Sequence, residues 1–226
     1  LKIFDALVIG AGETSIIQAI KDLKSNKLKK KYYPNGREDI NSYPFPCRKY
    51  LPKATIARPG LLTLKYKEGY DKIIGTTAIF SRGCPYKCAF CEIPSSKQYS
   101  PGIRYRAPEL IEEEITYLKN DYGIEGINLL DEICIPLSRR KAISHLEAIG
   151  RTEILWRGQC RVDGINNELA NLAKESGCIT MCLGIESVSQ TSLDMIKKNI
   201  KVERSLESIR ILKEAGIETR IYMIIG

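Results

Sequence analysis

The chain has 226 residues, 43% of them apolar and 27% charged, which is enough to bury one large hydrophobic core or two modest ones. No run approaches eighteen uncharged apolar residues, so a membrane-spanning helix is not expected. The 35 basic and 27 acidic residues give a net charge of +8, but much of the excess lies between Lys21 and Lys31 in a pattern typical of a solvated surface, so nucleic acid is not an expected partner.

The first thirty residues predict one strand, one turn and one helix. A buried strand is expected from Asp5 to Gly10, and an amphipathic helix from about Thr14 to Leu23. The small-residue turn between them resembles a dinucleotide-binding turn, because glycine lets backbone approach a phosphate. Ser15 replaces the third glycine of that motif, and no second strand with a terminal acid follows, so a nicotinamide or flavin site is not expected.

Residues 31–74 are rich in proline, glycine, tyrosine and charge. Prolines remove backbone donors and bias their neighbours to extended conformations, so this segment is predicted to be a linker or irregular wrap, with a short hairpin at most. Its lone Cys47 is interpreted as a structural residue, since single cysteines commonly serve as small apolar side chains.

After Gly75 the pattern becomes regular. Strands are expected at residues 76–80, 126–130, 153–157, 179–183 and 219–225, and helices at residues 108–120, 138–149, 166–176, 190–197 and 203–215. This alternation predicts a parallel sheet, because parallel neighbours need crossover connections. Five strand–helix units are more than a small doubly wound sheet needs and fewer than the eight of a closed barrel.

Three cysteines follow the first of these strands on one loop, in Ser-Arg-Gly-Cys84-Pro-Tyr-Lys-Cys88-Ala-Phe-Cys91. Iron–sulfur clusters are normally held by four thiolates, so three on one loop indicate a cubane whose fourth iron is open to another ligand. Zinc and disulfides are the alternatives. Structural zinc prefers four ligands, and the only histidine, His145, is more than fifty residues away. Eight cysteines with five scattered singly are not typical of a disulfide framework.

Polar residues at the expected strand ends are candidates for ligand binding, because ligands gather at the carboxyl ends of parallel strands. These residues are Asp131 and Glu132 after the second strand, Arg157 and Arg161 at and after the third, and Glu186 after the fourth. A purely structural role remains the alternative for Asp131, Glu132, Arg161 and Glu186. The paired carboxylates also fit a solvated loop, Arg161 has Asp163 nearby, and Glu186 needs a buried partner.

The cysteine spacing, with Phe90 just before the last cysteine, resembles the signature of the radical S-adenosylmethionine (radical SAM) enzymes. The whole loop motif, the later Gly184-Ile185-Glu186-Ser187 and the upstream Tyr43-Pro44-Phe45-Pro46 are similar to the branch that carries an N-terminal cobalamin-binding domain. This resemblance implies an α/β fold in which residues 75–226 form a partial (β/α)6 TIM-like barrel. About five of its six units would be present, with truncation before the sixth strand. Residues 31–74 would be a linker, and residues 1–30 the C-terminal remnant of a Rossmann-like cobalamin-binding domain.

The resemblance also implies a site. Cys84, Cys88 and Cys91 would hold a 4Fe-4S cluster, and the residues expected to contact S-adenosylmethionine are Phe90, Asp131, Glu132, Arg161, Glu186, Lys198 and Gly226. Asp131 and Glu132 match the place that holds the amino group of the cofactor, and Arg161 matches the arginine of the family. Glu186 matches the acid that binds the ribose, Lys198 a contact to the cofactor's carboxylate, and Gly226 a glycine that approaches the adenine. No further catalytic side chain is assigned.

The implied function is cleavage of S-adenosylmethionine to a 5′-deoxyadenosyl radical, followed by methyl transfer or ring formation on a small molecule with cobalamin as a further cofactor. A one-electron reductant such as flavodoxin or ferredoxin and a cytoplasmic setting are expected. One alternative is a radical methylthiotransferase-like enzyme acting on tRNA or protein, although no extra cluster cysteine precedes Cys47. The other is an inactive fragment or a non-enzymatic cluster-binding protein, because an incomplete barrel exposes an edge.

Overall fold

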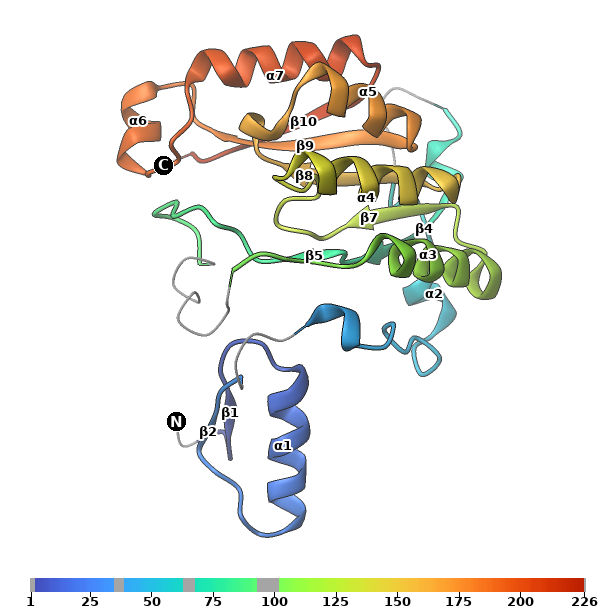
Figure 1. Cartoon of the computed structure of the whole chain (residues 1–226), viewed down its shortest axis with the longest axis vertical. Coiled ribbons are helices and arrows are strands. Elements are labelled where there is room, and N and C mark those ends of the chain that lie inside the picture. The colour runs from blue at the N-terminus through green and yellow to red at the C-terminus, as the bar shows by residue number, and fades with distance from the viewer. Residues whose placement is uncertain (1–2, 35–38, 63–67, 93–101, 226) are drawn as a thin grey trace.

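A computed structural model describes residues 3–34, 39–62, 68–92 and 102–225 of the chain. Its centre is a six-stranded sheet (Figure 1) whose spatial order is β3 (Arg58–Pro59), β4 (Ile74–Ala78), β7 (Gly126–Leu129), β8 (Leu155–Cys160), β9 (Cys178–Glu186) and β10 (Glu218–Met223). The strands from β4 to β10 are parallel, and β3 pairs antiparallel with β4. The predicted α/β class with a parallel-rich sheet is therefore confirmed.

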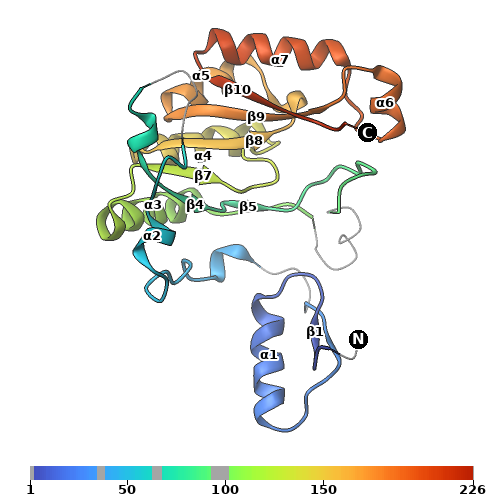
Figure 2. The ribbon, with the colours of Figure 1, turned by 180° about the vertical axis from the view of Figure 1, so that it is seen from behind.

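Helices cover one face of this sheet. They are α3 (Pro108–Tyr122), α4 (Arg139–Arg151), α5 (Asn167–Glu175) and α7 (Val202–Glu214), with the short α6 (Gln190–Met195) beside the end of β9. The strands come to the front when the molecule is seen from behind (Figure 2). The main core lies between the two layers, where Trp156 is fully buried and donates its indole N–H to the Ser176 carbonyl at 3.1 Å. Burial of such apolar surface is the main stabilising term for this layer pair.

The strands end at other residues than the sequence predicts. Strand β8 runs to Cys160, three residues beyond the predicted end. Polar and apolar side chains alternate along it, so no continuous apolar run marks its end in the sequence. It starts only at Leu155, since Glu153 adopts a left-handed φ of 54°. Arg157, expected at a strand end, consequently lies within β8, and Arg161 directly follows its last residue.

The N-terminal residues form a small unit beside the main sheet. Strand β1 (Leu7–Val8) pairs in parallel with β2 (Lys31–Tyr32), and α1 (Glu13–Lys24) connects them. The prediction of a buried strand over residues 5–10 is wrong in length and burial, because β1 has two residues and both are half-buried. One helix against a two-stranded sheet leaves little interior, so Ile17 of α1 is 53% exposed.

The described residues between the N-terminal unit and β4 are largely irregular, with single turns at η1 (Ile40–Ser42), α2 (Lys53–Ile56) and η2 (Tyr70–Lys72). Arg48 anchors it to the core. Its guanidinium donates to the Thr77 carbonyl at 2.9 Å and lies 3.6 Å from the buried Glu114 carboxylate. Strand β3 also belongs to this segment, and its pairing at the edge of the main sheet was not expected from the sequence.

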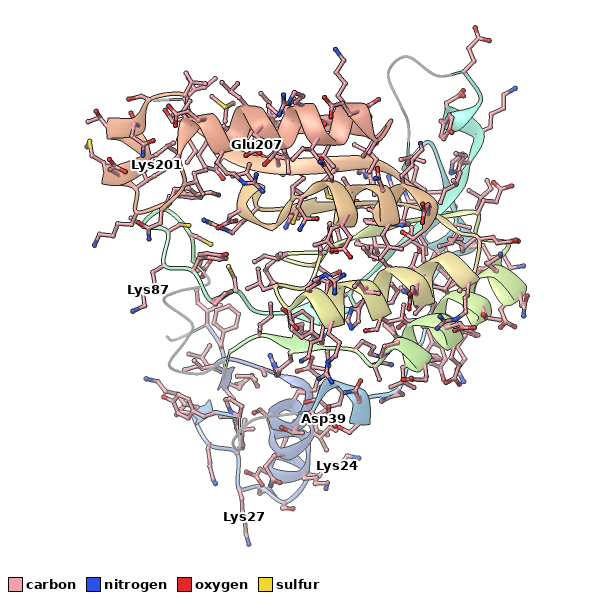
Figure 3. The ribbon with its side chains drawn as sticks, turned by 45° about the horizontal axis from the view of Figure 1, so that its top comes forward. Lys24, Lys27, Asp39, Lys87, Lys201 and Glu207 are labelled. Atoms are coloured by element: carbon pink, nitrogen blue, oxygen red, sulfur yellow. The ribbon has the colours of Figure 1, made fainter. Side chains whose placement is uncertain are left out.

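Among the helices of the described residues, none has both the length and the apolar character that crossing a membrane requires. The lysine-rich end of α1 projects away from the sheet, with Lys24 and Lys27 at the far end of the N-terminal unit (Figure 3). These two lysines therefore lie away from the main sheet.

Candidate cluster and cofactor site

Cys84, Cys88 and Cys91 line one cavity of about 190 Å³ at the carboxyl edge of the sheet, here called the cofactor cavity. Cys88 is buried, and all eight cysteines of the chain are free thiols, so the disulfide alternative is wrong. Burial raises the pKa of the Cys84 thiol. Within the described residues, no three His, Cys, Asp or Glu side chains could hold one metal ion. A cubane cluster instead takes each thiolate on a different iron, and three thiols on one loop fit that requirement.

The loop that carries these thiols is fixed at both sides. It follows β5 (Ser81–Arg82), which pairs antiparallel with β6 (Arg104–Tyr105). Gly83 opens the loop with a φ of 92°, and a Cβ there would lie 2.7 Å from the Gly102 carbonyl oxygen, so only glycine fits. Farther along, the Ala89 amide donates to the carbonyl at the end of α6 at 2.7 Å. Lys87 of this loop points outward (Figure 3).

Glu186 and Lys198 form a buried ion pair in the cofactor cavity. Lys198 Nζ donates to Glu186 Oε1 at 2.9 Å, and the two residues are only 8% and 6% exposed. Lys198 Nζ also lies 5.6 Å from the centroid of the Phe90 ring. A Cβ at Gly184 would lie 2.8 Å from Oε1 and 2.9 Å from Nζ, so the missing side chain makes room for the pair. The sequence predicted Glu186 and Lys198 as separate contacts, and the structure brings them together.

Arg161 lies between the cysteine loop and the end of α6. It donates to Asp163 Oδ1 at 3.0 Å and to the Lys198 carbonyl at 2.8 Å, and another of its nitrogens is 3.6 Å from Cys88 Sγ. Its guanidinium carbon is 3.6 Å from the centroid of the Tyr86 ring. Burial works against the charge, but the Asp163 carboxylate outweighs it and raises the pKa of Arg161. The pairing with Asp163 that the sequence left open is therefore present, and Arg161 also lines the cofactor cavity.

The adjacent carboxylates Asp131 and Glu132 have different surroundings. Glu132 lines the cofactor cavity and accepts a hydrogen bond from the Gly83 amide at 3.0 Å. Asp131 is 1% exposed, and both of its oxygens accept from the Phe80 amide at 3.2 Å. Burial raises the pKa of Asp131 to about 7. Asp131 is not among the described residues that line the cavity, so its contact is to the backbone at the entry to the cysteine loop.

Gln159, Cys160 and Tyr222 also line the cofactor cavity and were not predicted as site residues. Cys160 also belongs to the buried core. Alternation along a strand places Gln159 of β8 on the face opposite the core, but this signal is usable only once the strand limits are known. Gly226, predicted to approach the adenine, lies outside the described residues.

The family model described as "Radical SAM superfamily" matches residues 78–226, which include the cysteine loop and every strand from β7 to β10. The chain therefore belongs to the radical SAM superfamily. Membership implies a 4Fe-4S cluster and S-adenosylmethionine as cofactors, and the three free thiols with the charged residues around them fit both groups.

Similar proteins are longer than this chain. An uncharacterized methyltransferase of Pyrococcus horikoshii is 33% identical over 98% of this chain and 49% of its own. An anaerobic magnesium-protoporphyrin IX monomethyl ester cyclase of Rubrivivax gelatinosus is 32% identical over 65% of this chain and 26% of its own. The cobalamin-dependent S-adenosylmethionine radical enzyme OxsB, in its apo structure, shares the fold with a TM-score of 0.68 and 17% identity over 99% of this chain and 34% of its own. The chain spans about half the length of these relatives or less.

Proposed function

We propose that this chain serves a radical SAM enzyme that transfers a methyl group to a small molecule or closes a ring on it, with cobalamin as a further cofactor. The observation that carries the proposal is convergence. Three free thiols of one loop, the buried Glu186–Lys198 pair and Arg161 all line one cavity at the carboxyl edge of a parallel sheet. The names of relatives, a methyltransferase and a cyclase, support the reaction class.

The cluster, held by Cys84, Cys88 and Cys91, would supply the electron that cleaves S-adenosylmethionine. The side chains around it would bind and orient that cofactor. Glu132 offers an acceptor to the amino group, and Arg161 and Lys198 offer donors to the carboxylate. Glu186 offers an acceptor to the ribose hydroxyls and Phe90 an aromatic wall. Asp131 would support the loop backbone from outside the cavity, and Gly226, which lies outside the described residues, would be the glycine that approaches the adenine.

The Glu186–Lys198 pair has a further consequence for cofactor binding. A buried carboxylate and a buried ammonium each need a partner, and in this structure they satisfy each other. When the cofactor enters, its carboxylate would pair with Lys198 and its ribose hydroxyls would donate hydrogen bonds to Glu186, so neither group is left without a hydrogen-bond partner. The site is thereby kept charged and ordered before binding.

For the fold, we propose that β4, β7, β8, β9 and β10 with their helices are five units of a partial (β/α)6 barrel spanning residues 75–226. Residues 1–30 would be the end of a Rossmann-like cobalamin-binding domain, and residues 31–74 the linker. Strand order that follows chain order in the parallel sheet supports the first part. The parallel β1–β2 pair with α1 supports the second, although β2 extends this unit to Tyr32, two residues into the proposed linker. A small-molecule substrate and a flavodoxin or ferredoxin as reductant complete the proposal.

The test is anaerobic reconstitution with iron and sulfide, followed by absorption spectroscopy and assay of 5′-deoxyadenosine. The wild-type protein should bind one 4Fe-4S cluster and, with a reductant, form 5′-deoxyadenosine. Cys88→Ala should lose both signals, because the cluster would keep only two thiolates. Cys47→Ala is the matched control, because Cys47 is an exposed free thiol away from the cofactor cavity. A cluster-loaded protein that binds no S-adenosylmethionine would overturn the proposal.

A further inference from the structure

A second cavity, of about 250 Å³, adjoins the cofactor cavity, and Gln159 and Tyr222 line both. We call it the basic cavity. Its remaining lining residues lie on strands β7 to β10 or directly after β7. They are Asn128, Leu129, Leu130, Arg157, Gly158, Cys182 and Arg220. Of these described lining residues, two carry charge, and both are arginines.

Arg157 reaches the basic cavity from the middle of β8. Its neighbour Trp156 packs into the core beneath the helices, so Arg157 and Gln159 point to the opposite face by the alternation of a strand. Arg157 Nε donates to Asn128 Oδ1 at 2.8 Å. Within the described part of the chain, this neutral amide is the hydrogen-bond partner of Arg157, and no carboxylate forms an ion pair with the guanidinium group. A half-buried cation without a counter-charge is unfavourable, and a bound anion would relieve that cost.

Arg220 reaches the same cavity from β10 and pairs with Glu218 at 3.0 Å on its own strand. Strand β9 separates Arg157 from Arg220, and their register partners on it are Thr180 and Cys182. With a strand spacing of ~4.8 Å and a two-residue offset, their Cα atoms are about 12 Å apart. Two arginine side chains can meet a small group across that span.

Tyr222 lines the basic cavity together with Arg157 and Arg220. Burial and a hydrogen bond with Cys182 raise the pKa of Tyr222, whereas the charges of Arg157 and Arg220 both act to lower it. Tyr222 also lines the cofactor cavity, so it stands at the boundary between the two cavities.

We propose that the basic cavity binds an anionic oxygen group of the substrate, a carboxylate or a phosphate, between Arg157 and Arg220. The planar fork of a guanidinium group matches the oxygens of a carboxylate or a phosphate. Two arginines can therefore bind such a group by directed hydrogen bonds as well as by charge. The inference rests on the proposed function, because it assigns the cofactor cavity to S-adenosylmethionine and leaves the basic cavity to the substrate. Gln159 and Tyr222 then face the part of the substrate next to the anionic group.

The test measures binding of two probes, inorganic phosphate and succinate, to the cluster-loaded protein by calorimetry, with S-adenosylmethionine titrated separately. Arg157→Gln and Arg220→Gln should each weaken binding of the preferred probe about tenfold or more, since each removes a charge-assisted hydrogen bond. The double variant Lys24→Gln, Lys27→Gln is the control. It removes two charges at the far end of α1 (Figure 3) and should leave probe binding unchanged.

The two arms distinguish the source of the anion, because preference for phosphate or for succinate identifies the group. Affinity for S-adenosylmethionine should stay at the wild-type level in both arginine variants. If neither probe binds the wild-type protein, or if the lysine control weakens binding as much as the arginine variants, the inference is overturned. If the probes bind as expected but S-adenosylmethionine does not, the proposed function fails and the anion site stands.

Discussion

The buried Glu186–Lys198 pair allows a test of whether the site is formed in the folded protein before the cofactor binds. Lys198→Met keeps the length and apolar part of the side chain but removes its charge. Glu186 would then remain 8% exposed with its Nζ partner gone, at a position where Gly184 offers no replacement donor. Removing one member of a buried pair costs about 3–5 kcal/mol, because the remaining charge is uncompensated.

The double variant separates the pair from its parts. Glu186→Gln with Lys198→Met removes both charges and should recover most of the loss, giving a coupling free energy of about 2 kcal/mol or more. The control cycle uses Arg210→Met and Glu214→Gln on α7, where the charged atoms are 3.9 Å apart and the side chains are 70% and 65% exposed. Solvent screens that pair, so its coupling should be within error of zero.

The measurement is urea unfolding of the reduced protein without cluster or cofactor, with the dependence on urea compared across all variants. A constant slope means that the midpoints report stability alone. The reasoning is refuted if Lys198→Met loses no more stability than Arg210→Met, or if the effects at Glu186 and Lys198 simply add. Either result would mean that water reaches the pair and that it does not pre-form the site.

Three further predictions concern the single residues Asp131, Gly177 and Gly184. Because burial raises the pKa of Asp131 to about 7, the folded protein holds that proton more tightly than the unfolded chain. Stability should fall by at most about 4 kcal/mol as the pH rises from about 4 to 7, and urea titrations of Asp131→Asn should show a flatter profile. Gly177→Ala should cost at least about 3 kcal/mol, since φ is +96° and the new Cβ would lie 2.2 Å from the Ile154 carbonyl oxygen. Gly69→Ala, with a φ of +90° and open space, should cost only about 1 kcal/mol in the same unfolding assay, and equal losses would contradict this account. Gly184→Ala should weaken S-adenosylmethionine about tenfold or more in calorimetry, because its Cβ would displace the ends of the Glu186 and Lys198 side chains. Its folding should survive because those ends can move, and unchanged affinity would count against the assigned site.

The cysteine loop could be predicted from sequence because its information is local. Three thiols within eight residues define a ligand set without reference to the rest of the fold, and the structure keeps them on one cavity. The order of strands and helices was equally accessible, since it depends on periodicity. Two-residue strands such as β5 and β6 are too short to show periodicity, so the β5–β6 ribbon beside the cysteine loop could not be predicted from the sequence.

The contacts within the site were less accessible, because they depend on register and on chain reversal. Glu186 and Lys198 are twelve residues apart, and only the path of α6 brings their side chains together. Asp131 and Glu132 are neighbours in sequence, yet one is buried against backbone and the other lines the cofactor cavity. Arg157 appeared to end a strand, and the true limit of β8 moves it into the basic cavity.

The register of the sheet accounts for the adjacency of the two cavities. Gln159, Cys182 and Arg220 form one row across β8, β9 and β10, and Gly184 and Tyr222 form the next row toward the carboxyl edge. Side chains on one face advance by two residues per row, which is ~6.6 Å. Arg157 lies one row farther back, opposite Thr180, so the anionic group proposed between the two arginines would lie one to two rows from the Glu186–Lys198 pair above Gly184. On the proposed function, the sheet would set the distance between the substrate's anionic group and the cofactor, and it would favour substrates of matching length.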